Sequence, residues 1–249
     1  MTDHRVGTSC GTAVRILSLG LNRAAEMMSR PAPEKAIQAK HSEARRPRVK
    51  RTQAERSVET RDKLCRAALD AMNEVGYGRF ATEDVAERAQ VSRGALTHQF
   101  PTRNHLIVAA YDYLMREWER DWARTILHPT RLPPVEVTQL LWSRLFQSTH
   151  YVASLEIMLA ARNDDDLGKE IRAIMARWSD HRDRLIAHLL GTSEADERMR
   201  SFIQLNLCVL RGIALHHNFS TDSSAGLQRQ LLEMWKQMIE REFHIMHLS

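Results

Sequence analysis

Hydrophobic residues recur every three or four positions along most of this chain, a spacing that predicts α-helices. The first helix is expected over residues 55–74, and Gly76 is well placed to end it as a C-cap. A long helix follows over 106–123. The apolar positions of the first helix are Val58, Leu64, Ala67, Ala68, Ala71 and Met72.

The helical pattern continues through the second half of the chain. Residues 128–134 (HPTRLPP) predict a loop, and helices are expected over 137–146 and 153–161. Three aspartates at 164–166 indicate the N-cap of a longer helix, which stops at Gly191. The apolar stripe of that helix is Leu167, Ile171, Ile174, Trp178, Leu185 and Leu189.

The last two predicted helices have more apolar surface than one chain usually buries. Residues 202–215 are apolar on nearly every side, and residues 227–238 form a strong amphipathic stripe. Helices of this kind at the end of a chain often pack against another subunit, so we expect a homodimer. The expected interface residues are Leu205, Val209, Gly212, Leu231, Met234 and Met238.

Residues 82–106 contain the start, turn and end signals of a helix-turn-helix. Thr82 with two following acids indicates one helix start, Gln90-Val91 a turn, and Ser92 the cap of a second helix. Pro101 ends the unit and opens the next helix. Because Leu96 and Phe100 lie on one face of the second helix, its other face is free for a major groove of double-stranded DNA. The residues expected on that face are Arg93, Gly94, Ala95, Thr97, His98 and Gln99.

Composition changes this interpretation little. Residues 1–50 hold ten Lys or Arg against four Asp or Glu, so the net charge of +5 comes from this segment and the rest is nearly neutral. We expect residues 1–50 to be a disordered basic tail. Alternatively, the sequence begins at an upstream start codon, and Met27 or Met28 is the true first residue of the protein. Residues 45–51 are equally consistent with a basic arm that contacts DNA.

Several functional classes lack their usual sequence features. Three distant cysteines without a CxxC give neither a disulfide framework nor a zinc knuckle, and favour a reducing cytoplasm. No membrane span or secretory signal is expected. The acids at 164–166 are a routine helix cap, and His216-His217 cannot both face one metal. We expect no metal and no cofactor.

Large or polar residues on the apolar helices of the second half are candidates for a ligand pocket. Arg211 is the most suggestive, because a cation within FIQLNLCVLRGIAL needs an anionic ligand or a partner such as Glu156. Most of the others could equally be ordinary core. The candidates are Trp118, Trp142, Phe146, His150, Leu155, Met158, Trp178 and Arg211.

Over residues 58–118 the chain resembles the TetR family of bacterial transcriptional repressors. The family pattern of a Thr followed by [Val/Ile]-Ala, then Val-Ser-x-Gly-x-Leu-Tyr-x-His-Phe, resembles this chain at Thr82, Ala86, Val91, Ser92, Gly94, Leu96 and Phe100. The chain departs from it at Gln90, Thr97, Gln99 and Arg103, where the family usually has Gly or Ala, Tyr, His and Lys. A positive φ at Gln90 would cost about 1 kcal/mol relative to Gly.

The resemblance implies an all-α protein in which residues 55–118 form a three-helix DNA-binding module and residues 119–249 a helical ligand-binding and dimerisation domain. Thr82, Ser92 and Arg103 are then expected to contact phosphates, while residues 93–99 read the groove. A small-molecule effector would release a homodimer from a palindromic operator. The alternatives are a sequence-tolerant architectural DNA binder and a helical enzyme, whose usual motifs are missing from the sequence.

Overall fold

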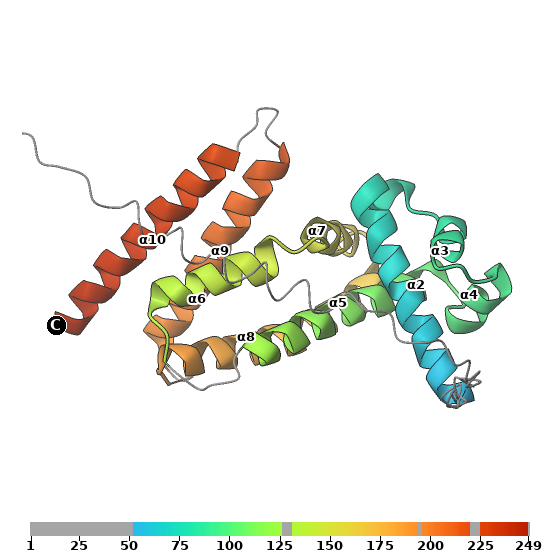
Figure 1. Cartoon of the computed structure of the whole chain (residues 1–249), viewed down its shortest axis with the longest axis horizontal. Coiled ribbons are helices and arrows are strands. Elements are labelled where there is room, and N and C mark those ends of the chain that lie inside the picture. The colour runs from blue at the N-terminus through green and yellow to red at the C-terminus, as the bar shows by residue number, and fades with distance from the viewer. Residues whose placement is uncertain (1–51, 126–130, 194–195, 220–224, 249) are drawn as a thin grey trace, which may run out of the picture. The chain divides into compact units, whose positions relative to one another are not determined.

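The structure, a computed structural model, describes residues 52–125, 131–193, 196–219 and 225–248, which form helices and no strand (Figure 1). The all-α class expected from the sequence is therefore confirmed. The chain divides into residues 1–50 and 51–249, and the predicted basic tail lies outside the described residues. The predicted boundary at 118/119 falls inside a continuous helix, so a division there stays a prediction.

The N-terminal helices build a small module around one apolar cluster. Helix α2 (Gln53–Val75) begins two residues before the predicted start, because Thr52 and Glu55 form a reciprocal capping box with hydrogen bonds of 3.2 and 2.7 Å. Gly76 ends the helix as predicted, at a positive φ of 79°. A 3₁₀ turn η2 (Tyr77–Arg79), α3 (Thr82–Arg88) and α4 (Arg93–Gln99) follow.

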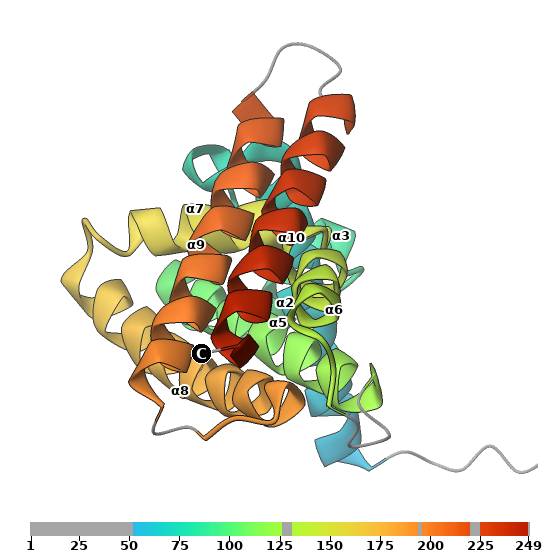
Figure 2. The same ribbon diagram turned by 90° about the vertical axis from the view of Figure 1, so that its left-hand side faces the viewer.

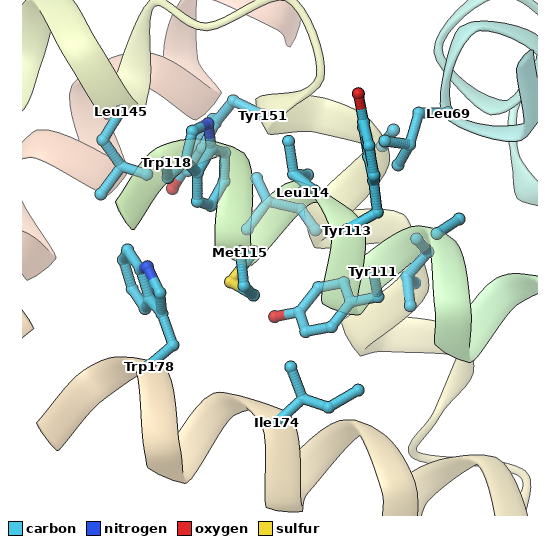
Figure 3. Packing of buried hydrophobic residues seen from close by; sticks show 14 of the residues in the cluster. Leu69, Tyr111, Tyr113, Leu114, Met115, Trp118, Leu145, Tyr151, Ile174 and Trp178 are labelled. Carbon is cyan, nitrogen blue, oxygen red and sulfur yellow. The ribbon is translucent and has the colours of Figure 1, made fainter. Parts of the chain in front are cut away.

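Helix α5 (Arg103–Thr125) joins this module to the rest of the described chain, packing on α2 and α8. Arg66 of α2 donates a hydrogen bond of 2.8 Å to the Tyr113 hydroxyl of α5. On the α8 side, Arg177 pairs with Asp112 at 2.8 Å. In Figure 3 the side chains of α5 and α8 point toward one another, with Tyr111, Met115 and Trp118 facing Ile174 and Trp178. One apolar core therefore extends across both parts.

The middle of the chain differs in one respect from the sequence prediction. The helix expected over 137–146 is α6 (Pro134–Leu141) followed by a π-helical turn η3 (Trp142–Phe146), in which the Gln147 amide reaches back five residues to the Trp142 carbonyl. Helix α7 (Tyr151–Ala160) precedes α8 (Asp165–Leu190). Asp164 caps α8 by accepting the Leu167 amide at 2.9 Å, and Gly191 ends it at φ 69°, as predicted.

Helices α9 (Glu197–Phe219) and α10 (Ala225–Leu248) pack against each other in opposite directions, side by side in both views (Figures 1 and 2). Trp235 Nε1 donates a 2.8 Å hydrogen bond to Asn206 Oδ1, and the Phe202 and Phe243 rings meet edge to face at 4.6 Å. The pair covers only part of its apolar surface. Side chains on α9 and α10 that remain exposed include Leu205, Leu227, Met234 and Met238.

Candidate functional site

Helices α3 and α4 form the predicted helix-turn-helix, with one correction at its start. The N-cap of α3 is Ala81, and the predicted cap Thr82 is the first helical residue. Its hydroxyl lies 3.3 Å from Glu83 Oε2 and not on a backbone amide. In the turn, Gln90 takes a positive φ of 56°, a conformation that favours Gly over residues with a Cβ.

The second helix of the motif is oriented as the sequence predicts. Ser92 caps α4 by accepting the Ala95 amide at 3.1 Å. Leu96 and Phe100 are buried in the core, whereas α4 stops at Gln99 and Phe100 is its C-cap. Four candidate DNA-contacting residues of α4 are exposed: Arg93, Gly94, Thr97 and His98. Ala95 is half-buried.

Gly94 has no neighbour that would explain a glycine. A Cβ atom placed there would come no closer than 3.9 Å to any atom, and that atom is the Ser92 hydroxyl oxygen. Glycine is a poor helix former, so its presence costs up to about 1 kcal/mol without any gain in packing within the chain. An external surface that approaches the α4 backbone closely would account for it.

Two other predicted contact residues are held inside the module. Gln99 donates from Nε2 to the Ser57 hydroxyl at 2.9 Å, which ties α4 to α2. Arg103 donates to both the hydroxyl and the backbone carbonyl of Tyr77, at 3.1 and 2.9 Å, with its guanidinium 4.5 Å above the Tyr77 ring. The phosphate contact expected of Arg103 stays a prediction, and two of the five N–H donors of its guanidinium are used within the chain.

Helix α7 contacts the DNA-binding module through two polar groups that sequence reasoning did not place there. The Glu156 carboxylate accepts the Tyr77 amide, so the expected pairing of Glu156 with Arg211 is wrong. His150, predicted to line a pocket, instead has its Nε2 2.7 Å from Asp70 Oδ1 on α2. Both partners lie about eighty residues away in sequence, and no local pattern signals such contacts.

Five of the predicted pocket residues meet at a small cavity between α5, η3, α7, α8 and α9. They are Trp118, Phe146, Met158, Trp178 and Arg211. The cavity has a volume of about 20 Å³, enough for a single water molecule. Trp142 and Leu155 are buried but do not line it. Sequence reasoning missed Tyr111, Tyr151, Met175 and Arg182, which also line the cavity.

The polar groups of the cavity are mostly cations and phenols. Burial lowers the pKa of Arg182, an effect that Asp183 opposes and Arg211 reinforces. Burial raises the pKa of Tyr151 and of Tyr111, and the Arg211 guanidinium opposes both shifts. Arg211 Nε has no hydrogen-bond partner in the described part of the chain, and the Tyr151 hydroxyl, which the Arg211 guanidinium approaches as a donor, has no acceptor there for its own proton.

The exposed face of α9 and α10 (Leu205, Gly212, Met234 and Met238) contains four of the six predicted interface residues. The exposed fractions of Leu205, Met234 and Met238 are 55%, 47% and 53%, and a Cβ at Gly212 would meet nothing within 4 Å. Val209 and Leu231 are different, because both are half-buried against the chain's own core. These two therefore contribute at least partly to internal packing.

Other site types are not found within the described residues. No group of three or more His, Cys, Asp or Glu side chains there could hold a metal ion. In the same ranges, no helix is both long and apolar enough to cross a membrane.

Burial raises the pKa of the Cys65 thiol to about 12, so this cysteine stays protonated and inert.

Comparisons with known proteins agree with this geometry. The profile of "Bacterial regulatory proteins, tetR family" matches residues 64–110, from α2 through the helix-turn-helix into α5. The chain is 37% identical over 133 residues to the HTH-type transcriptional regulator CymR of Pseudomonas putida, covering 51% of this chain and 64% of that protein. It is 30% identical over 130 residues to an uncharacterized HTH-type transcriptional regulator of Mycobacterium bovis, covering 52% and 67%.

The chain thus spans about two thirds of the length of these relatives. A crystal structure of a transcriptional regulator from Rhodococcus sp. Rha1 has the same fold, with a TM-score of 0.58 at 19% identity, over 73% of this chain and 96% of that one. The identity with the Mycobacterium protein extends beyond the helix-turn-helix, over half of this chain. The chain belongs to the TetR family of bacterial regulatory proteins.

Proposed function

We propose that this chain is a DNA-binding transcriptional repressor that reads a palindromic operator as a homodimer and is released by a small molecule. The observation that supports DNA binding most directly is the exposed face of α4. There Arg93, Thr97 and His98 surround a glycine for which the chain itself has no structural need. A glycine at that point lets a helix backbone approach a groove closely, while the side chains beside it contact base edges or phosphates.

Release by an effector is supported by the position of α7 between the cavity and the DNA-binding module. Tyr151, Ser154 and Met158 of this helix line the cavity. Glu156 and the preceding His150 contact η2 and α2. A cavity of about 20 Å³ is too small for an organic effector, so binding must displace at least one of its walls. Displacement of α7 would transmit that change to the module.

The DNA-binding half of the proposal is tested by selection. Purified full-length protein is mixed with random double-stranded fragments, the retained fragments are sequenced, and gel shifts then measure binding to the selected site against excess random competitor. We expect a palindromic consensus. Retention without any consensus would favour the sequence-tolerant architectural binder, the alternative function.

The assignment of α4 is tested in the same assay with Arg93→Ala. This side chain is exposed at the start of α4 and is the cation best placed for guanine or phosphate. Its loss should weaken binding to the selected site by about 1–3 kcal/mol and leave the helical content unchanged. Arg124→Ala, at an exposed position in the last turn of α5, is the matched control and should bind normally. Equal affinities for the two variants would contradict the assignment.

A further inference from the structure

The cavity has an excess of positive charge that nothing in the described chain balances. Arg182 is only 6% exposed, stacks 4.6 Å above the Trp178 ring, and donates from Nε to Asp183 at 2.8 Å. Asp183 also accepts a hydrogen bond from Gln204, so its capacity is already shared. Arg211 lines the same cavity, and no carboxylate is among the lining residues. Asp183 therefore balances Arg182, whereas no ion pair balances Arg211 among the described residues.

Two donors of the cavity lack acceptors. The Arg211 guanidinium lies beside the Tyr151 hydroxyl and lowers its pKa as a hydrogen-bond donor, but neither Arg211 Nε nor the Tyr151 O–H has an acceptor among the described residues. The Ser154 hydroxyl uses its proton on the Tyr151 carbonyl at 2.6 Å, so its oxygen can still accept, but it carries no charge that could balance Arg211. Since burial raises the pKa of Tyr151, the phenol keeps its proton at neutral pH and can donate. One water molecule could accept from Arg211, but it would not neutralise the charge.

The remaining walls of the cavity are suited to a flat apolar group. The Trp118 and Trp178 rings lie 5.6 Å apart, and Phe146 meets Tyr151 edge to face at 5.0 Å. Met158 and Met175, two flexible and polarizable side chains, are half-buried at the same cavity. Their rearrangement is the cheapest way to enlarge it, because an unbranched thioether repacks with little strain. Trp118, Tyr151 and Trp178 are labelled in Figure 3.

We propose that the effector is an aromatic carboxylate that places its carboxylate on Arg211 and the Tyr151 hydroxyl and its ring against Trp118 and Trp178. This assignment rests on the proposed function, since it names the ligand class of the regulatory cavity. An ionised carboxylate accepts from both free donors and supplies the missing negative charge. Neutral amides of the same shape cannot supply that charge, and cationic aromatic compounds would add to the excess.

The experiment measures direct binding to the full-length protein by isothermal titration calorimetry and by the shift of its melting temperature. The probes are benzoate, phenylacetate and 2-naphthoate, each compared with its primary amide. We expect at least one carboxylate to bind, and its amide to bind about tenfold more weakly or not at all, as the loss of a charged hydrogen bond implies. Equal binding of carboxylate and amide, or no binding by any carboxylate at millimolar concentration, would overturn the proposal.

The variant that tests the role of Arg211 is Arg211→Met, which keeps the length and apolar stem of the side chain. It should abolish the preference for carboxylate over amide, while the ligand-free melting temperature does not fall, because an unpaired buried donor has been removed. Arg211→Lys should restore part of the preference. Arg200→Met, at an exposed position on the same helix, is the control and should bind like the parent protein. A retained carboxylate preference in Arg211→Met would contradict the proposed contact.

Gel shifts on the selected operator separate this proposal from the one it rests on. Carboxylate binding that depends on Arg211 but leaves the DNA complex intact would support the ligand class and refute regulation through this cavity. Release of the DNA by neutral or cationic aromatics, with carboxylates inert, would support regulation and refute the ligand class.

Discussion

Gly94 is a residue at which stability and DNA binding are expected to oppose each other. It lies in the first turn of α4, where a Cβ would meet only the Ser92 hydroxyl oxygen at 3.9 Å. Gly94→Ala should therefore raise the free energy of unfolding, by up to about 1 kcal/mol, through helix propensity alone. The same methyl would stand between the α4 backbone and the groove, so affinity for the selected operator should fall.

Urea unfolding and gel shifts on one preparation measure both effects. Gly78→Ala is a matched control, because Gly78 also has open space around its Cβ position but lies in η2, outside α4. That variant should bind DNA as the parent protein does. A Gly94→Ala protein that is more stable and binds its operator undiminished would exclude close backbone approach at this position.

Residue identity predicted the local features of the site and failed at contacts between distant segments. Ser92 at a cap and the buried pair Leu96 and Phe100 follow from spacing within one turn of helix, and the structure has all three as expected. Two donors of Arg103 meet Tyr77, a residue with no periodic relation to it, while the phosphate contact expected of Arg103 stays a prediction. Glu156, one of the two partners considered for Arg211, accepts the backbone amide of Tyr77, another contact that spacing along the chain does not predict.

At the scale of whole elements, the spacing of hydrophobic residues predicts that a helix is present more accurately than it predicts where the helix begins or ends. Helix α2 begins before its apolar pattern, because the Thr52–Glu55 capping box starts it. The hydrophobic period cannot show polar residues of this kind, but the Thr-x-x-Glu signature predicts the helix start. The π-helical turn over Trp142–Phe146 could not be predicted, since an added residue per turn leaves a run of large apolar side chains looking helical. The sequence does not predict that Tyr111 and Arg182 line the cavity, because the cavity forms only where five elements meet.

Helix α7 is the element whose contacts should control the position of the DNA-binding module. Glu156→Ala removes the acceptor of the Tyr77 amide and leaves that amide without a protein partner. We expect faster hydrogen exchange at Tyr77 and across α3 and α4, with α9 and α10 unchanged, because the lost contact is local to η2. Operator affinity should fall as the orientation of the module becomes less fixed.

Hydrogen exchange with mass spectrometry measures this effect, and Glu170→Ala is its control. Glu170 is an exposed acid on α8 whose removal should alter neither exchange in the module nor DNA binding. Unchanged protection of Tyr77 in Glu156→Ala would show that α7 does not hold the module through this carboxylate.

For the whole molecule, tight DNA binding requires two modules at a fixed separation. One helix-turn-helix contacts one half-site, and two half-sites in successive major grooves are about 34–36 Å apart. The exposed face of α9 and α10 is the surface best suited to hold two copies together, because it combines three large apolar side chains with an unobstructed glycine. Homodimerisation through this face is accordingly our proposal.

The double variant Met234→Glu and Met238→Glu tests it. Both side chains are about half exposed in the single chain, at 47% and 53%, so acids there should be tolerated by the monomer. In a dimer seam they would bury unpaired charge, at a cost of several kcal/mol, and light scattering should show a folded monomer that no longer binds its operator tightly. Leu159→Glu, at a 60% exposed apolar position on α7, is the control and should remain dimeric. A folded dimer of the double variant that still binds operator would place the interface on another surface.

Leu231 is not substituted because it packs against the chain's own core. An acid there could unfold the monomer, so loss of the dimer could not be told from loss of the fold.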